Sequence, residues 1–103
     1  AKKDEEIKVQ TFFVKSLKVD AGTLVSQAKT PEIKAELTKV YEAIRYSDPM
    51  SNSALFDIEE QIKNEFKAFS DAVKDEDIEL TIILAKNLLA LLKTRNDNCK
   101  LLK

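Results

Sequence analysis

The sequence predicts an all-α protein and, more narrowly, a four-helix antiparallel up-and-down bundle. The chain of 103 residues holds one Gly and two Pro. Because tight turns between strands draw on these residues, so low a number favours long helices. Hydrophobic residues make up 44% of the chain and recur at steps of three and four residues, as on one face of a helix. The length suits one domain, so residues 1–103 are expected to form a single one.

The first helix is predicted over residues 4–28. Its apolar stripe consists of Ile7, Val14, Leu17, Ala21, Leu24, Val25 and Ala28. Gly22 lies inside this helix, where a glycine costs about 1 kcal/mol relative to alanine. Either a bend or a close crossing with another helix would explain a glycine at this position.

The second helix is predicted over residues 31–46, with signals at both ends. Thr30 is a suitable N-cap and Pro31 fits the first helical position. The apolar stripe is Ile33, Leu37, Val40, Tyr41 and Ile44. The run Ser47-Asp48-Pro49 ends the helix, because proline disfavours helical backbone in the residue before it.

The third helix is predicted over residues 53–74, with Ser51 or Ser53 as its N-cap. Its stripe keeps to steps of three and four throughout and consists of Leu55, Ile58, Ile62, Phe66, Phe69 and Val73. Such regular spacing is strong evidence for an amphipathic helix that buries one face.

The fourth helix is predicted over residues 77–100, with Asp75 or Asp77 as its N-cap. One apolar face consists of Ile78, Ile82, Ala85, Leu88, Leu89, Leu92 and Cys99, and a second of Leu80, Ile83, Leu84, Leu91 and Leu102. A helix that is apolar over most of its circumference is buried on several sides. This helix is therefore either the centre of the bundle or the carrier of an additional interface. Short connections make consecutive helices antiparallel.

The residue inventory argues against most catalytic and metal-binding chemistry. The chain has no histidine, which removes histidine-dependent triads, zinc sites and di-iron sites. One cysteine, Cys99, forms neither an internal disulfide nor an iron–sulfur site, and one glycine does not build a phosphate-binding loop. The acidic residues 75–79 lack the glycine and spacing of a calcium loop. We therefore expect no enzyme, no metal and no cofactor.

The charge balance argues against two kinds of partner. With 17 basic and 18 acidic residues, the chain has no net field that attracts nucleic acid. Its most apolar stretch, residues 80–92, includes Lys86 and is shorter than the ~20 residues that a membrane span needs. We expect neither nucleic-acid binding nor membrane insertion. A single cysteine, which forms no internal disulfide, favours a cytoplasmic location, and a start at Ala1 without an N-cap predicts a processed protein or a piece of a longer one.

A candidate partner surface lies at one end of the predicted bundle. The second helix is shorter than the others, so the first helix loses that neighbour near Phe13, which leaves a gap that the 47–53 segment covers or a groove. Exposed aromatic and arginine side chains together are typical of interaction hot spots. The candidate residues are Phe12, Arg45, Tyr46, Asp48, Met50, Phe56 and Arg95. Local packing under the loop, with Arg45 paired to Glu42, is the alternative.

These patterns predict a non-catalytic protein–protein interaction or scaffolding module. One alternative is a homo-oligomeric bundle in which Leu80, Leu84 and Leu91 meet their symmetry mates. Another is a carrier of a small apolar ligand with a cavity among the four helices, although helices of this kind usually pack solidly.

Overall fold

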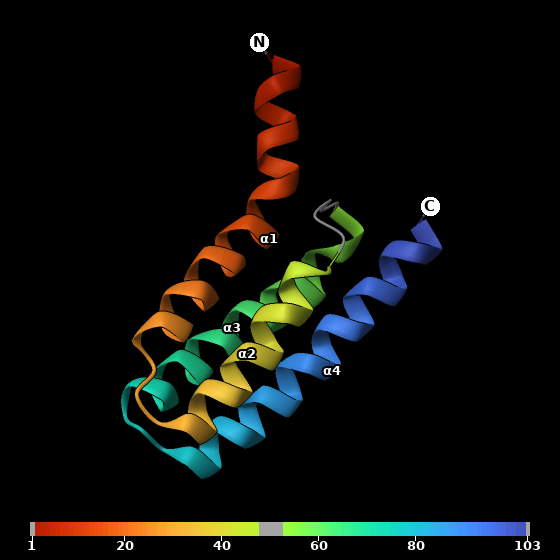
Figure 1. The fold of residues 1–103 in the computed structure, drawn as a ribbon. Helices are drawn as coiled ribbons and strands as arrows, with labels where there is room; N and C mark the ends of the chain where they lie inside the picture. The colour runs from red at the N-terminus through yellow and green to blue at the C-terminus, as the bar shows by residue number, and fades with distance from the viewer. Residues whose placement is uncertain (1, 48–52, 103) are drawn as a thin grey trace.

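Four helices make up the protein, as a computed structural model shows. Residues 2–47 and 53–102 are described, with side chains from Phe12 to Ser47 and from Ser53 to Leu101. Among them the elements are α1 (Lys2–Gln27), α2 (Pro31–Arg45), the 3-10 turn η1 (Ser53–Leu55), α3 (Phe56–Lys74) and α4 (Ile78–Leu102). Figure 1 shows that successive helices run in alternating directions. The predicted all-α class is confirmed.

The helix ends follow the predicted signals only in part. Asp77 caps α4, because its Oδ1 accepts a hydrogen bond of 3.1 Å from the Leu80 amide. Thr30 has the extended backbone of an N-cap, but its side chain makes no capping hydrogen bond. The start of α3 differs more, since residues 53–55 form a 3-10 turn and Leu55 takes the N-cap position. Ser53 is therefore not the cap, and Ser51 lies outside the described residues.

The turn between α3 and α4 closes with a Schellman motif. The Asp77 amide donates to the Ala72 carbonyl at 3.0 Å, and the Glu76 amide donates to the Val73 carbonyl at 3.1 Å. Glu76 has a φ of 56°, a left-handed conformation that glycine adopts at lower cost. This turn reverses the chain tightly and brings α4 directly back along α3.

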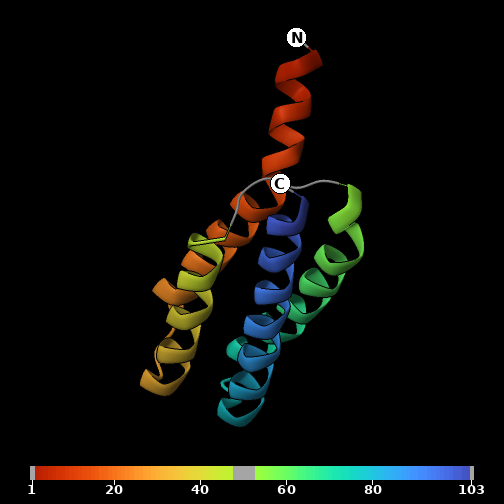
Figure 2. The ribbon, with the colours of Figure 1, turned by 90° about the vertical axis from the view of Figure 1, so that its right-hand side faces the viewer.

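The central helix is α4, which packs on both α2 and α3. Figure 2 shows α4 between these two helices. The helix α1 packs on α2 and makes only slight contact with α3. The central position of α4 agrees with one of the two explanations that its sequence allowed, and Leu80 and Ile83 of its second apolar face stay exposed.

One cluster of buried side chains draws on all four helices. Its members without exposed surface are Ala21, Leu37, Val40, Ile44, Ile62, Phe69 and Ala85. A Cβ placed on Gly22 would lie 3.4 Å from Tyr41 Cε1 of α2, so this glycine packs against the Tyr41 ring. Beyond this core, the first turns of α1 project past the other helices (Figures 1 and 2).

Candidate functional site

A long groove lies between α1 and α3. Its volume is about 1120 Å³, and it extends from Phe12 to Gln27 along α1 and from Ser53 to Lys74 along η1 and α3. Both helices run in the same direction (Figure 1) and touch only slightly. The space between them is therefore open to solvent along its length rather than filled by interlocking side chains.

Aromatic side chains gather at one end of the groove. Phe12 is 68% exposed and Phe56 is 62% exposed, while Phe13 is half-buried. All three line the groove. Exposed aromatic rings beside a groove are the usual anchors of a protein interface. Two members of the predicted partner surface, Phe12 and Phe56, are thus brought to one site from helices far apart in the sequence.

Further along, the groove has an apolar floor and polar walls. Leu17, Leu24 and Phe66 are buried and belong to the shared core. The walls differ in charge. The lining of α1 contributes Ser16, Asp20, Thr23 and Gln27, whereas the lining of α3 contributes Glu59, Glu60, Lys63, Lys67, Ser70, Asp71 and Lys74. A groove with an apolar floor and polar walls is typical of a surface that binds an amphipathic helix.

Arg95 does not belong to an exposed partner surface, and that prediction is wrong. Its side chain is 0% exposed, and its Nε lies 3.0 Å from Glu59 Oε2. Its guanidinium carbon lies 5.4 Å from the centre of the Phe13 ring. Because α4 is the central helix, α1 and α3 cover Arg95, which forms a buried ion pair beside the aromatic end of the groove.

Polar contacts also connect the ends of α2 and α4. Asn96 Nδ2 donates to Ser47 Oγ at 3.4 Å, and Ser47 Oγ donates to the Ala43 carbonyl at 2.7 Å. Cys99, which follows Arg95 by one helical turn, is also buried. The end of the bundle that holds the aromatic rings is therefore fixed by side-chain hydrogen bonds as well as by apolar packing.

The remaining predicted partner residues lie elsewhere. Arg45 and Tyr46 are exposed at the end of α2, outside the lining of the groove. The Arg45 guanidinium carbon lies 5.7 Å from the centre of the Tyr46 ring, and Nη1 lies 4.0 Å from Glu42 Oε2. Asp48 and Met50 lie outside the described residues. The structure thus separates the predicted surface into a groove and an exposed pair.

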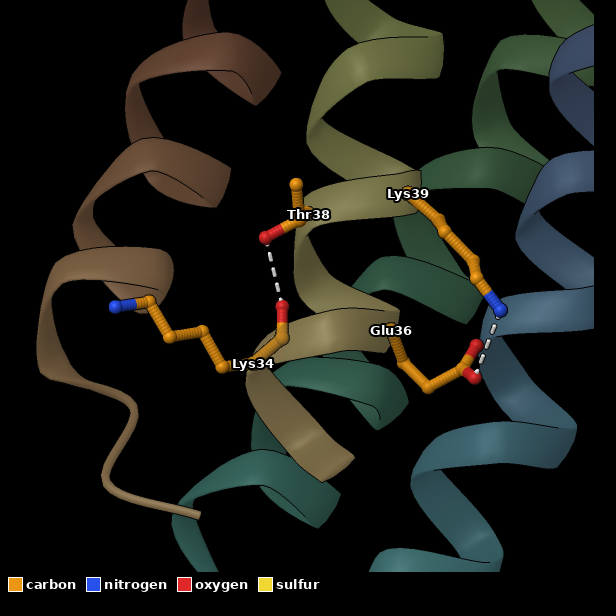
Figure 3. A network of polar contacts seen from close by, with 4 residues as sticks. All are labelled: Lys34, Glu36, Thr38 and Lys39. Atoms are coloured by element: carbon orange, nitrogen blue, oxygen red, sulfur yellow. Dashed lines mark hydrogen bonds and ion pairs between the residues drawn. The ribbon is translucent and has the colours of Figure 1, made fainter. Parts of the chain in front are cut away.

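The outer face of α2 has the character of an ordinary solvated surface. Lys39 Nζ lies 3.2 Å from Glu36 Oε1, and Thr38 Oγ1 donates to the Lys34 carbonyl at 2.8 Å (Figure 3). These contacts stay within one helix, where such pairs contribute a few tenths of a kcal/mol. Nothing in this face resembles the aromatic end of the groove.

The predicted self-association face of α4 is not a continuous exposed surface. Leu84 is buried in the core between the helices, so its assignment to an outward face is wrong. Leu91 is half-buried, while Leu80 and the neighbouring Ile83 are exposed. The second apolar face is thus buried only in part by the neighbours of α4.

None of the described helices is both long enough and apolar enough to cross a membrane. Across residues 2–47 and 53–102, no three His, Cys, Asp or Glu residues gather in a group that could hold a metal ion. Comparison with protein-family models, curated proteins and solved structures found no match to this chain.

Sequence analysis missed the charged wall of the groove and the partner of Arg95. Glu59 occupies the same face of its helix as Leu55 and Ile62, where a carboxylate within an apolar stripe indicates a buried pair. Similarly, Arg95 fills the step between Leu92 and Cys99 on the stripe of α4. A charged residue at a stripe position in each of the two helices was the feature of the sequence that indicated an ion pair between them.

Proposed function

We propose that this chain is a non-catalytic interaction module whose α1–α3 groove binds a helix of another protein. The observation that carries this proposal is the pair of exposed rings, Phe12 and Phe56, at one end of an open groove with an apolar floor. Binding in such a groove would cover both rings and extend the core by one helix. The absence of histidine and the burial of Cys99 support a role without catalysis.

The shape of the groove favours a helix over a small apolar ligand. Sites for small molecules enclose most of the ligand surface, whereas exposed side chains such as Phe12, Phe56 and Lys67 line this groove. Self-association through α4 has less support, since Leu84 is buried, although Ile78, Leu80 and Ile83 are exposed near it. A reducing, cytoplasmic setting fits the single buried thiol and belongs to the same proposal.

A designed peptide tests whether the groove accepts a helix. The probe is an uncharged amphipathic peptide of about 16 residues, which matches the groove at a rise of 1.5 Å per residue. It carries a leucine stripe and a fluorophore, and binding is measured by fluorescence anisotropy. We expect Phe12→Ser and Phe56→Ser each to weaken binding about tenfold, as loss of a hot-spot residue does.

The chain offers matched controls outside the groove. Val19 is 66% exposed and Tyr46 is 77% exposed, and neither lines the groove. Val19→Ser and Tyr46→Ser should leave the affinity unchanged. Absence of peptide binding at millimolar concentration, or an equal loss in the control variants, would contradict the proposal. Sedimentation of the protein alone checks the self-association alternative, which a monomer at high micromolar concentration removes.

A further inference from the structure

The wall that α3 contributes to the groove carries a row of lysines. Lys63, Lys67 and Lys74 all line the groove, one and two helical turns apart. The opposite wall, on α1, contributes one charged residue, Asp20, among uncharged polar side chains. The α3 wall also carries Glu59, Glu60 and Asp71, so the pairing of these carboxylates decides which charges a helix between the walls would meet.

Two of these lysines keep their charge available for a ligand. Lys63 Nζ lies 3.4 Å from Glu60 Oε1, and Glu59 is paired with Arg95. Within the described part of the chain, neither Lys67 nor Lys74 lies within 4.0 Å of a carboxylate oxygen. Asp71 lies between them on the same wall, so the charges not matched by an ion pair on this wall are two lysines and one aspartate.

The dimensions of the groove fit one side of a helix. From Phe12 to Gln27 the α1 wall is about 22 Å long at 1.5 Å per residue. A helix of that length and ordinary diameter occupies roughly 2000 Å³. The groove volume of about 1120 Å³ thus receives roughly half of such a helix, which leaves the other half exposed to solvent.

From this charge pattern we infer that the partner is an amphipathic helix of about 15 residues with acidic residues along the edge that faces α3. The inference rests on the proposed function. The apolar stripe of the partner packs over Leu17, Leu24 and Phe66. Its acidic residues lie opposite Lys67 and Lys74, and the edge that faces α1 is uncharged or carries a base opposite Asp20.

Three peptides test this charge preference. All share one leucine stripe, and they differ only along one edge, which carries glutamates, lysines or glutamines. We expect the acidic peptide to bind about tenfold more tightly than the basic one at low salt, and this difference to shrink as salt screens the charges. The double variant Lys67→Glu/Lys74→Glu should reverse the order of the acidic and basic peptides.

A second pair of lysines supplies the control. Lys86 and Lys93 are exposed on α4 and lie outside the groove. The variant Lys86→Glu/Lys93→Glu changes the net charge equally and should keep the preference for the acidic peptide. Thermal melting of both double variants checks that they fold.

The outcomes separate this inference from the function on which it rests. Equal affinity for all three peptides, with loss of binding in Phe56→Ser, overturns the acidic partner but supports a groove that binds helices. Binding of none of the peptides overturns both. A reversal of preference in the α4 control variant shows a net-charge effect and also overturns the inference.

Discussion

The helix α3 takes part in two interfaces that differ sharply: a tight one with α4 and an open one with α1. Along the tight interface, both partners repeat buried positions at alternating steps of four and three residues. These positions are Leu55, the partly buried Glu59, Ile62, Phe66, Phe69 and Val73 on one side, and Thr81, Ala85, Leu88, Leu92, Arg95 and Cys99 on the other. Such heptad spacing keeps two helices in contact over their full length.

The ion pair between Glu59 and Arg95 marks the antiparallel register of the tight interface. Counting along the two repeats from this pair places Phe69 opposite Ala85, a large side chain against a small one. Side chains of complementary size fill the space between helices without voids. A buried polar pair is costly to form, and its best-attested role is the choice of register.

The open interface lacks such a repeat of apolar residues. The side of α1 that faces the groove places Ser16, Asp20, Thr23 and Gln27 at helical spacing, and α3 presents mainly charged residues there. Burying these side chains between two helices would cost their hydration. The comparison teaches that the groove arises from polar residues facing polar residues, while the apolar stripe of α1 is already used in the core.

Two phenylalanines of α3 give the largest expected contrast. Phe69 is fully buried in the tight interface, whereas Phe56 is exposed beside the groove. We expect Phe69→Ala to lower the free energy of unfolding by about 3–5 kcal/mol, and Phe56→Ala to change it by no more than about 0.5 kcal/mol. Urea unfolding followed by circular dichroism measures both. Similar losses in the two variants would contradict the distinction between core and groove.

The buried ion pair gives the next largest effect. Arg95→Ala leaves Glu59 without this charge partner and should cost about 3 kcal/mol of unfolding free energy. The exposed Arg45, whose nitrogen lies 4.0 Å from Glu42, supplies the control, since Arg45→Ala should cost no more than about 0.5 kcal/mol.

A double variant sharpens the interpretation of that pair. Glu59→Leu combined with Arg95→Met replaces both charges with apolar side chains and should recover most of the stability lost in Arg95→Ala. If the double variant is less stable than Arg95→Ala alone, the cost does not come from an unmatched buried charge.

The smallest effect concerns the turn that leads into the tight interface. Glu76 has a positive φ, so Glu76→Gly should raise the free energy of unfolding by about 1 kcal/mol because it relieves left-handed strain. Asp75, next to it, has a φ of −81°, so Asp75→Gly should lower stability by about 0.5 kcal/mol. Thermal unfolding measures both changes, and equal signs would contradict the assignment of the Schellman motif.

The sequence predicted the helices better than their arrangement. Each helix carries its own apolar stripe, and this local signal is enough to predict the all-α class and most helix bounds. The position of Arg95 was missed because its partner, Glu59, is 36 residues away, and an arginine near a chain end resembles an exposed one. A heptad reading of α4 that included Arg95 would have placed it in the core.

The groove between α1 and α3 was not predicted, although Phe12 and Phe56 at its aromatic end were singled out because they lie off their stripes. The gap predicted near Phe13 was a different one, left by the short second helix. Which two helices stay apart depends on how all four share the core, and no single stripe contains that information. The lysines of α3 therefore looked like an ordinary solvated face until α1 was placed beside them.

The shared direction of α1 and α3 gives the groove a polarity. Both helices end at the same mouth, marked by Gln27 and Lys74, where the aligned peptide dipoles of each helix place partial negative charge. A ligand helix that enters with its amino-terminal end at this mouth aligns its dipole favourably with both walls, and the reverse orientation opposes them. Two peptides of identical composition, one with the reversed sequence of the other, would thus bind with different affinities, because the same side-chain contacts would require opposite helix orientations in the groove.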